Sequence, residues 1–270
     1  MKAVAEAAQR LAHVSGSPRL DAELLLAHAL GVDREQLLLN PPTEMPDAFE
    51  DLIARRERGE PVAYIVGKRA FWTIELEVAP GVLIPRPDSE TLIEAAVEHF
   101  HGSAGPKRVL DLGTGSGALL LAALDQWPQS SGVGVDRSPD AIAIAQRNAE
   151  RLGMSDRAEF RVGDWAEGTE ERFDLILCNP PYVAVSGDLG PGVAEHEPHE
   201  ALFAGEEGLD ALRFLAPQFP RLLANGGLAA VEIGFDQAAS AASLLAGDAI
   251  SARVARDLAG RPRALLLTCV

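Results

Sequence analysis

Beyond residue 88 the chain alternates short apolar runs with segments of helical periodicity, and this alternation constrains the fold more than any other feature. The apolar runs span 108–111, 132–136, 158–162, 173–178, 227–233, 253–255 and 264–268. Such alternation is typical of a mostly parallel sheet with helices on both faces. Ligands of these sheets bind outside the carboxyl ends of the strands. We therefore predict an α/β domain over residues 88–270, with its site just after the strand ends.

The chain before this domain is predicted to be helical and then to form a hairpin. Apolar residues recur at helical spacing through residues 1–68, which predicts a small helical bundle. Within residues 69–87 the period changes to two, because Ile74, Leu76 and Val78 alternate with polar residues. We therefore predict an N-terminal helical domain at 1–68 and a β-hairpin linker at 69–87.

The charge and the cysteine content limit the classes of partner and compartment. The formal net charge of −16 argues against broad electrostatic binding to a nucleic-acid backbone, which requires a basic surface. The two cysteines, Cys178 and Cys269, show no disulfide or zinc spacing. The N-terminus lacks the apolar core of a signal peptide, and no stretch is apolar enough to span a membrane. We expect a cytoplasmic protein whose partner is a protein or a small molecule, without a membrane or direct nucleic-acid contact.

The first motif, residues 111–117, reads Asp-Leu-Gly-Thr-Gly-Ser-Gly and follows the first apolar run. Its glycines allow a tight turn and a close approach of the backbone to a ligand. Asp136 ends the second apolar run and offers a carboxylate suited to two ribose hydroxyls. This spacing predicts an adenosine-containing cofactor, bound by Asp111, Gly113, Thr114, Gly115, Ser116, Gly117 and Asp136.

Two other interpretations of this motif remain open. Gly113, Gly115 and Ala118 also satisfy the dinucleotide pattern GxGxxG/A, and a glycine turn can bind nothing at all. Asp111 argues against a dinucleotide, because it would repel a pyrophosphate but suits the ammonium of an amino-acid moiety such as that of methionine. Asp164 and Trp165 follow the third run and could frame an adenine, although Trp165 as a core residue fits the sequence equally well.

The second motif is Asn-Pro-Pro-Tyr at residues 179–182, directly after the fourth apolar run. The two prolines remove backbone donors and leave carbonyl acceptors, while Asn179 adds a side-chain oxygen. Two acceptors of this kind can hold an NH₂ group, and Tyr182 can stack on a planar amide or base. The alternative interpretation of this motif is an ordinary proline-rich turn that binds no ligand. We predict that Asn179, Pro180, Pro181 and Tyr182 bind the acceptor, with Asn179, Pro180 and Tyr182 catalytic.

An amide or exocyclic nitrogen delocalises its lone pair and is a poor nucleophile. Catalysis must then come from position: two acceptors fix the nitrogen, favour its pyramidalisation and stabilise the positive charge that develops on it. No metal or covalent intermediate is needed. His196 and His199 are therefore interpreted as part of a solvated acidic loop rather than as metal ligands, since Pro198 breaks the helical face between them.

Nearly the whole chain resembles the PrmC/HemK family, the glutamine-N5 methyltransferases of peptide-chain release factors. The matching segments are 18–26, 55–61, 67–72, 83–90, 111–117, 145–148, 179–182, 197–198 and 201–202. Asn-Pro-Pro-Tyr also occurs in DNA adenine-N6 enzymes, so this motif does not identify the substrate. The resemblance to enzymes that act on release factors rests on the helical N-terminal region and the Ile-Pro-Arg-Pro segment at 84–87. Two departures are Ser89, where the family often has Thr, and a looser match at 257–263.

The resemblance implies a class I methyltransferase domain, Rossmann-like with a seven-stranded sheet, behind a helical domain that helps bind the release factor. It implies S-adenosyl-L-methionine as cofactor and the glutamine of a Gly-Gly-Gln motif as acceptor. By matching position, the glycine motif, Asp136, Trp165 and Asn179 would contact the cofactor. Residues 179–182 would hold the glutamine amide. A nucleic-acid adenine methyltransferase and a dinucleotide-binding module or dehydrogenase are the alternatives.

Two residues outside the motifs carry weaker interpretations. Cys178 precedes Asn179 on a buried strand and is read as a small core residue rather than a nucleophile. Arg86 lies between two prolines just before the α/β domain. We hypothesise that its segment shapes the cofactor or acceptor pocket.

Overall fold

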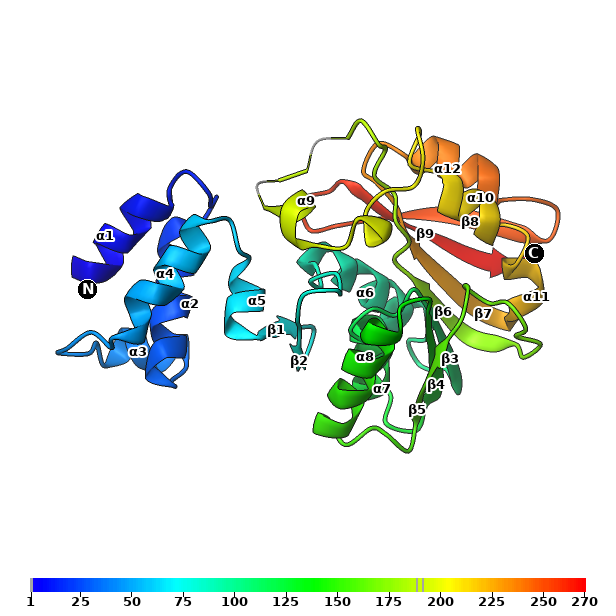
Figure 1. Cartoon of the computed structure of the whole chain (residues 1–270). Helices are drawn as coiled ribbons and strands as arrows, with labels where there is room; N and C mark the ends of the chain where they lie inside the picture. Colours follow the sequence, from blue (N-terminus) through cyan, green and yellow to red (C-terminus); the bar gives the residue numbers. More distant parts are fainter. Residues whose placement is uncertain (1, 188, 191) are drawn as a thin grey trace. The chain divides into compact units, whose positions relative to one another are not determined.

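The computed structural model describes residues 2–187, 189–190 and 192–270, and they form two compact units (Figure 1). The smaller unit comprises residues 2–68 and 78–80 and the described residues between 189 and 197. The larger unit comprises residues 69–77, 81–187 and 198–270. Each unit has its own buried apolar core.

The smaller unit is helical, as predicted for the start of the chain. Its helices are α1 (Lys2–Leu11), α2 (Pro18–Leu30), α3 (Arg34–Leu39), α4 (Ala48–Glu57), α5 (Val62–Val66) and α9 (Val193–His196). Pro18 opens α2, and Gly31 ends it in the left-handed conformation. A capping box between Asp33 and Gln36 starts α3. Leu11, Leu25, Phe49 and Ile53 belong to its core.

The β-hairpin is present, but its strands lie earlier than the alternation suggested. β1 (Lys68–Phe71) pairs with β2 (Ile74–Glu77), and the two-residue turn between them carries Trp72 at φ 53°. The alternation of Ile74 and Leu76 identified the second strand. Only Phe71 of the first strand is buried, so periodicity could not reveal it. No strand is assigned among the described residues 78–87, where three prolines remove backbone donors.

The larger unit contains the predicted seven-stranded, mostly parallel sheet (Figure 1). Its strands are β3 (Arg108–Leu112), β4 (Ser131–Asp136), β5 (Ala158–Val162), β6 (Phe173–Cys178), β7 (Leu223–Glu232), β8 (Ile250–Arg256) and β9 (Pro262–Cys269). They follow the order β5-β4-β3-β6-β7-β9-β8. Strands β3 to β7 pair in parallel, and β9 is antiparallel to both β7 and β8.

Helices cover both faces of this sheet. One face carries α6 (Glu90–His99), α7 (Ala118–Gln126) and α8 (Pro139–Arg151), and the other carries α10 (Asp210–Leu215), α11 (Phe219–Leu222) and α12 (Ala238–Leu245) (Figure 1). Two 3-10 helices, η1 (Pro87–Ser89) and η2 (His199–Ala201), complete the unit. Alternate strand residues face opposite cores, so that Val109 belongs to the same core as Leu120, whereas Leu110 belongs to the same core as Leu212.

The register of β3 brings the two sequence motifs together. Leu112 pairs with Val135 on one side and with Cys178 on the other. The glycine motif, Asp136 and Asn179 therefore leave the sheet side by side. After β5 the chain crosses to the other side of β3, which makes this edge the switch point where ligands of such sheets bind.

A buried amide ties the hairpin and the glycine motif to the sheet's helical layer. Asn148 on α8 is fully buried, and its Nδ2 donates to the carbonyl oxygens of Glu77 at 3.0 Å and Ser116 at 2.9 Å. Its Oδ1 accepts from the Glu77 backbone N–H at 2.7 Å. All three partners are backbone groups, and they would be left unpaired if the amide were removed.

We expect Asn148→Ala to lower the free energy of unfolding of the larger unit by about 2–4 kcal/mol, because buried backbone groups lose their partner. Gln146→Ala, at an exposed position of the same helix, should change it by less than about 0.5 kcal/mol. Urea unfolding followed by tryptophan fluorescence measures this, since Trp72, Trp127 and Trp165 all belong to the larger unit. Equal stability of the two variants would contradict the assigned role.

Candidate active site

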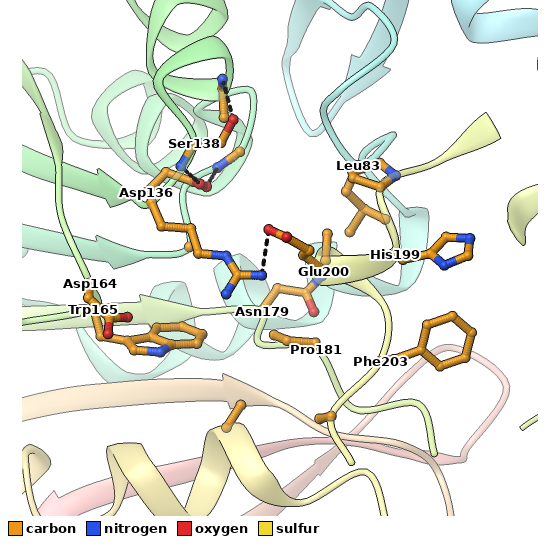
Figure 2. A pocket seen from close by; sticks show the side chains of 18 of the residues that line it. Leu83, Asp136, Ser138, Asp164, Trp165, Asn179, Pro181, His199, Glu200 and Phe203 are labelled. Atoms are coloured by element: carbon orange, nitrogen blue, oxygen red, sulfur yellow. Dashed lines mark hydrogen bonds and ion pairs between the residues drawn. The ribbon is translucent and has the colours of Figure 1, made fainter. Parts of the chain in front are cut away.

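A cavity of about 620 Å³ opens at the carboxyl edge of the sheet, within the larger unit (Figure 2). This volume is in the range of small-molecule sites. The predicted site residues that line it are Gly113, Gly115, Asp136, Asp164, Trp165, Asn179 and Pro181. The remaining predicted residues lie around it and are placed one by one below.

The glycine motif forms the floor of the cavity. The N–H groups of Gly113 and Thr114 both donate to the Val135 carbonyl, at 2.9 and 3.0 Å, and bind the loop to β4. Gly113 and Gly115 adopt φ values of 73° and 55°, which side chains rarely tolerate. A Cβ at Gly115 would meet no atom within 4 Å. The backbone there faces open space that a ligand can approach.

Asp136 stands at the end of β4 with both carboxylate oxygens held by backbone donors. Oδ2 accepts from the Gly115 N–H and Oδ1 accepts from the Ser138 N–H, each at 2.9 Å. Ser138 also caps α8 by accepting from Ala141 at 3.2 Å. The carboxylate is thereby fixed in orientation, and its remaining lone pairs are available on the cavity wall. This is the arrangement needed to accept two hydrogen bonds from a diol.

Trp165 borders the cavity next to Asp164, which is exposed (Figure 2). Its φ of 51° is unusual for a bulky residue and stores backbone strain. The indole also packs against the core on the α10 side of the sheet. A Cβ added to Gly113 would lie 3.5 Å from this ring, so the ring lies directly beside the floor of the cavity. The residue thus contributes both to the core and to the wall.

Four predicted cofactor residues lie behind the floor rather than on it. Thr114 and Ser116 are buried, and Gly117 is the N-cap residue of α7. Asp111 is fully buried; its Oδ2 accepts from Thr114 Oγ1 at 2.6 Å and from the Leu120 N–H at 3.2 Å. Burial raises the pKa of Asp111 to about 7. These residues shape the loop from beneath.

Asp111 retains one unsatisfied atom. Its Oδ1 is buried and has no hydrogen-bond partner among the residues that the structure describes. Buried polar atoms are rarely left unpaired. An anionic acceptor beneath the glycine loop fits a cofactor that carries an ammonium group, whereas it would disfavour a pyrophosphate. The donor set therefore fits an amino-acid nucleoside.

The second motif continues from β6 into the cavity. Asn179 and Pro181 line the wall, Pro180 is buried, and Tyr182 is half-buried. The Nδ2 of Asn179 donates to Ser89 Oγ at 3.1 Å, and the Tyr182 hydroxyl donates to Glu232 Oε1 at 3.1 Å. Burial raises the pKa of Tyr182 and keeps its phenol neutral.

The opposite wall comes from segments to which the motifs did not point. Val183 forms a bridge with Phe203, with hydrogen bonds of 2.9 Å between Val183 N–H and the Leu202 carbonyl and between Ala204 N–H and the Val183 carbonyl. Phe203 lies on this side together with Leu83 from the segment after the hairpin (Figure 2). Phe214 of α10 also lines the cavity. Arg137 and Glu200 form an ion pair of 2.7 Å.

Phe203 and Phe214 could not have been recognised from the sequence, because isolated apolar residues in a loop and a short helix resemble any core residue. Glu232 could have been, since an acid that ends an apolar strand at the same sheet edge is the signal that identified Asp136. Leu83 lines the cavity, so the segment of residues 83–90, which contains Arg86, begins at the cavity. The role of Arg86 itself stays a prediction.

His199 lies on the cavity wall, while His196 belongs to the smaller unit. Among the described residues, no group of three or more His, Cys, Asp or Glu side chains is placed to hold a metal ion. Within the same residues no helix has the length and hydropathy required to cross a membrane.

The cavity therefore brings two sets of polar groups together at the carboxyl edge of the sheet. Its floor and the Asp136 side suit an amino-acid nucleoside, and Asn179 offers polar atoms for a planar nitrogen beside it. Solved structures share this fold: a methyltransferase from Pyrococcus furiosus matches with a TM-score of 0.56 and 18% identity, over 82% of this chain and 98% of its own. The ribosomal protein L11 methylase from Lactobacillus delbrueckii subsp. bulgaricus matches with a TM-score of 0.51 and 22% identity, over 68% and 80%.

Sequence comparison identifies the protein family of the chain more closely than the fold does. Residues 2–67 match the PrmC N-terminal domain and residues 105–237 match a methyltransferase domain. A release factor glutamine methyltransferase from Rhodospirillum rubrum is 46% identical, covering 92% of this chain and 78% of the relative. Those from Caulobacter vibrioides and Pseudomonas aeruginosa are 40% and 43% identical, covering 92% and 93% of this chain and 89% and 93% of the relatives. The chain belongs to the release factor glutamine methyltransferase family, whose two-part organisation and cofactor-binding fold its own structure displays.

Proposed function

We propose that this protein transfers the methyl group of S-adenosyl-L-methionine to the side-chain amide nitrogen, N5, of the glutamine in the Gly-Gly-Gln motif of a peptide-chain release factor. The observation that carries the proposal is the register of β3, which sets Asn179 next to the glycine loop at one cavity. The helical unit that matches the PrmC N-terminal domain supports a protein substrate. The net charge of −16 disfavours a nucleic-acid substrate.

The cofactor, when bound, supplies an electrophilic methyl group on a sulfonium. Asp136 accepts hydrogen bonds from the ribose hydroxyls, and Trp165 with Asp164 frames the adenine. Gly113 and Gly115 let the backbone approach the ligand, while the unpaired Oδ1 of Asp111 receives the ammonium of the methionine part. Thr114, Ser116 and Gly117 hold the loop in shape.

The acceptor amide is held by residues 179–182. The Asn179 side-chain oxygen and the Pro180 carbonyl accept the two N–H groups of the glutamine, and Pro181 and Tyr182 border its plane. Fixed acceptors localise the nitrogen lone pair and stabilise the positive charge that develops on the nitrogen. The proton released on methylation leaves to solvent.

We also propose that the protein works in the cytoplasm. Cys178 and Cys269 are free thiols, which suits a reducing compartment. Burial raises the pKa of Cys178 well above its ordinary value, so this thiol stays protonated and serves as a small core residue.

The assigned reaction predicts label transfer from methyl-labelled S-adenosylmethionine to an intact release factor. The label should map to the Gly-Gly-Gln peptide by mass spectrometry, and a factor with Gln→Ala in that motif should stay unlabelled. Transfer to DNA or RNA oligonucleotides that falls steeply with salt would instead favour an adenine-N6 enzyme. A short Gly-Gly-Gln peptide tests whether the helical unit contributes to recognition, because only the intact factor can contact it.

Asn179→Ala should lower kcat by about 10²–10³-fold, since one positioned acceptor of the transition state is lost. Cofactor affinity, measured by calorimetry with S-adenosylhomocysteine, should change far less. Asn40→Ala, at an exposed position of the smaller unit, serves as a matched control and should leave kcat unchanged. A near wild-type kcat for Asn179→Ala would remove Asn179 from the mechanism.

Asp111→Asn separates the binding role of this residue from its structural one. An amide NH₂ in place of Oδ1 cannot accept from an ammonium, so cofactor affinity should fall about tenfold or more. In the absence of cofactor, Asp111→Asn should instead raise the free energy of unfolding at high pH. The raised pKa of Asp111, about 7, means that its contribution to wild-type stability is present at acidic pH and is lost as pH rises through about 7.

The Asn variant lacks this titration, so its free energy of unfolding should gain on that of the wild type between about pH 4 and pH 7 and keep a constant difference above pH 7. Urea unfolding across this range measures the difference, and calorimetry at pH 8 measures the affinity. Unchanged affinity would show that Asp111 is purely structural, and a constant stability difference across pH would show that its pKa is not raised.

A further inference from the structure

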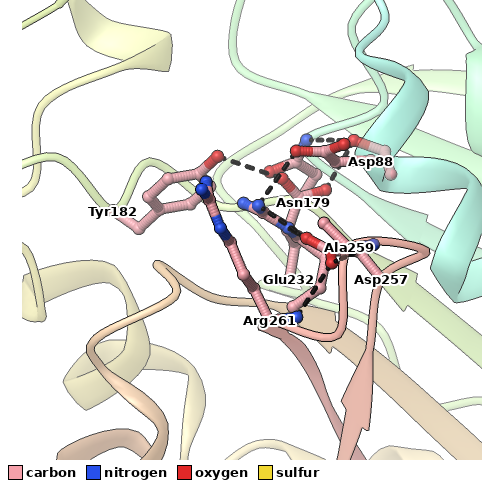
Figure 3. Close-up of polar contacts among 9 residues, drawn as sticks. Asp88, Asn179, Tyr182, Glu232, Asp257, Ala259 and Arg261 are labelled. Atoms are coloured by element: carbon pink, nitrogen blue, oxygen red, sulfur yellow. Dashed lines mark hydrogen bonds and ion pairs between the residues drawn. The ribbon is translucent and has the colours of Figure 1, made fainter.

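A continuous hydrogen-bonded chain runs from the acceptor site into the protein interior. Asn179 Nδ2 donates to Ser89 Oγ at 3.1 Å, and Ser89 Oγ donates to Glu232 Oε2 at 2.5 Å. The second oxygen of Glu232 accepts from the Tyr182 hydroxyl at 3.1 Å. Figure 3 shows Tyr182 and Asn179 on either side of this carboxylate. One buried acid thus connects the first and last residues of the Asn-Pro-Pro-Tyr motif.

The members of this chain come from distant parts of the sequence and are shielded from water. Ser89 belongs to η1 and is 3% exposed, and Glu232 ends β7 and is fully buried. A buried charged side chain is costly unless it is well paired. Neither Ser89 nor Glu232 belongs to the cavity wall, so a direct contact with the cofactor does not account for them.

Counting protons fixes the orientation of the Asn179 amide. An ionised Glu232 can only accept, so the single proton of the Ser89 hydroxyl points to Glu232. Ser89 then has only lone pairs to offer Asn179, and Asn179 must present its NH₂ group to Ser89. Its Oδ1 is therefore turned away from Ser89 and is free to accept. An acceptor oxygen is what a substrate NH₂ group requires.

We propose that Glu232 is a positioning residue of this enzyme: through Ser89 it sets the amide of Asn179 with its oxygen toward the acceptor nitrogen, and through the Tyr182 hydroxyl it holds the aromatic ring of the same motif. The proposal rests on the proposed function, because it assigns Asn179 Oδ1 to the substrate amide. It adds two residues, Ser89 and Glu232, that act without touching the reacting atoms.

Protonation of Glu232 reverses the direction of the hydrogen bonds that Ser89 makes. A neutral Glu232 can donate to Ser89, which frees the hydroxyl proton to point to Asn179 and lets the amide turn over. The pKa of Glu232 is raised to about 7, chiefly by burial and also by nearby Asp88, although Ser89, Tyr182 and Arg263 act to lower it. Cys178, whose own pKa is raised partly by this carboxylate, is also near. Turnover should therefore decline as pH falls through about 7.

The test measures kcat with saturating release factor and cofactor from pH 6 to pH 8.5. Glu232→Gln should lower kcat at pH 8 by about 10–10²-fold, because small misplacements of a positioning group have effects of this size. The step in kcat near pH 7 should disappear in this variant. Asp111→Asn should retain the step, although the pKa of Asp111 is also about 7. A step that survives in Glu232→Gln would overturn the proposal.

A pair of variants at Ser89 tests the same chain independently, in case Glu232→Gln fails to fold. Ser89→Ala removes the relay hydroxyl and should lower kcat about 10–10²-fold with little effect on S-adenosylhomocysteine affinity. Ser89→Thr restores the hydroxyl and should recover most of the loss. Ser130→Ala removes another buried hydroxyl, which donates to the Pro106 carbonyl at the opposite edge of the sheet, and should affect stability but not kcat. Equal kcat in Ser89→Ala and wild type would refute the relay.

Failure of the proposed function remains distinguishable from failure of the relay. If the wild type leaves the release factor unlabelled, the function is wrong, and the side-chain NH₂ resonances of Asn179 then decide the relay by NMR. Assigned with Asn179→Ala, they should titrate near pH 7 in the wild type and lose this titration in Ser89→Ala. Resonances that are insensitive to pH in the wild type would contradict the proposal whatever the substrate is.

Discussion

The parallel pairing of β3 with both β4 and β6 is the constraint on which the rest of the site depends. Because Leu112 pairs with Val135 on one side and Cys178 on the other, three segments that are distant in sequence leave the sheet at one place. The glycine loop, Asp136 and Asn179 need no further arrangement to meet. Apolar residues on both faces of β3 pack against separate helical layers, so a shift of register would expose one core and separate the two halves of the site.

Two buried carboxylates give this site its electrostatic character. Asp111 beneath the glycine loop and Glu232 behind the Asn-Pro-Pro-Tyr motif are both fully buried, and burial raises the pKa of each to about 7. The two carboxylates differ in how their oxygens are hydrogen-bonded. Within the described part of the chain, Asp111 keeps one oxygen unpaired, whereas both oxygens of Glu232 are occupied by hydroxyl donors. The first suits a charged ligand, and the second suits the orientation of neutral side chains.

Sequence patterns predicted most of the larger unit because its central strands β3, β4 and β6 are buried on both faces and read as apolar runs. They predicted the hairpin but did not locate its first strand, Lys68–Phe71, in which only Phe71 is buried. Asp111 illustrates a second limit: the sequence predicted it as part of the cofactor motif but could not show that its carboxylate is buried under the loop. Ser89 was noted only as a departure from the family pattern, and its link to Asn179 through space could not be read from residues 90 positions apart.

The sequence by itself determined the fold class and predicted the glycine motif and Asn179 as site residues, because periodicity, glycine spacing and donor or acceptor type are properties of local residues. Only the tertiary structure decided which groups meet. It placed Phe203 and Phe214 on the cavity wall and connected Glu232 to the acceptor motif. These relations depend on strand order and register, which arise from the packing of whole elements. A hydroxyl and a carboxylate acquire a positioning role only when folding sets them within hydrogen-bonding distance of Asn179 and of each other.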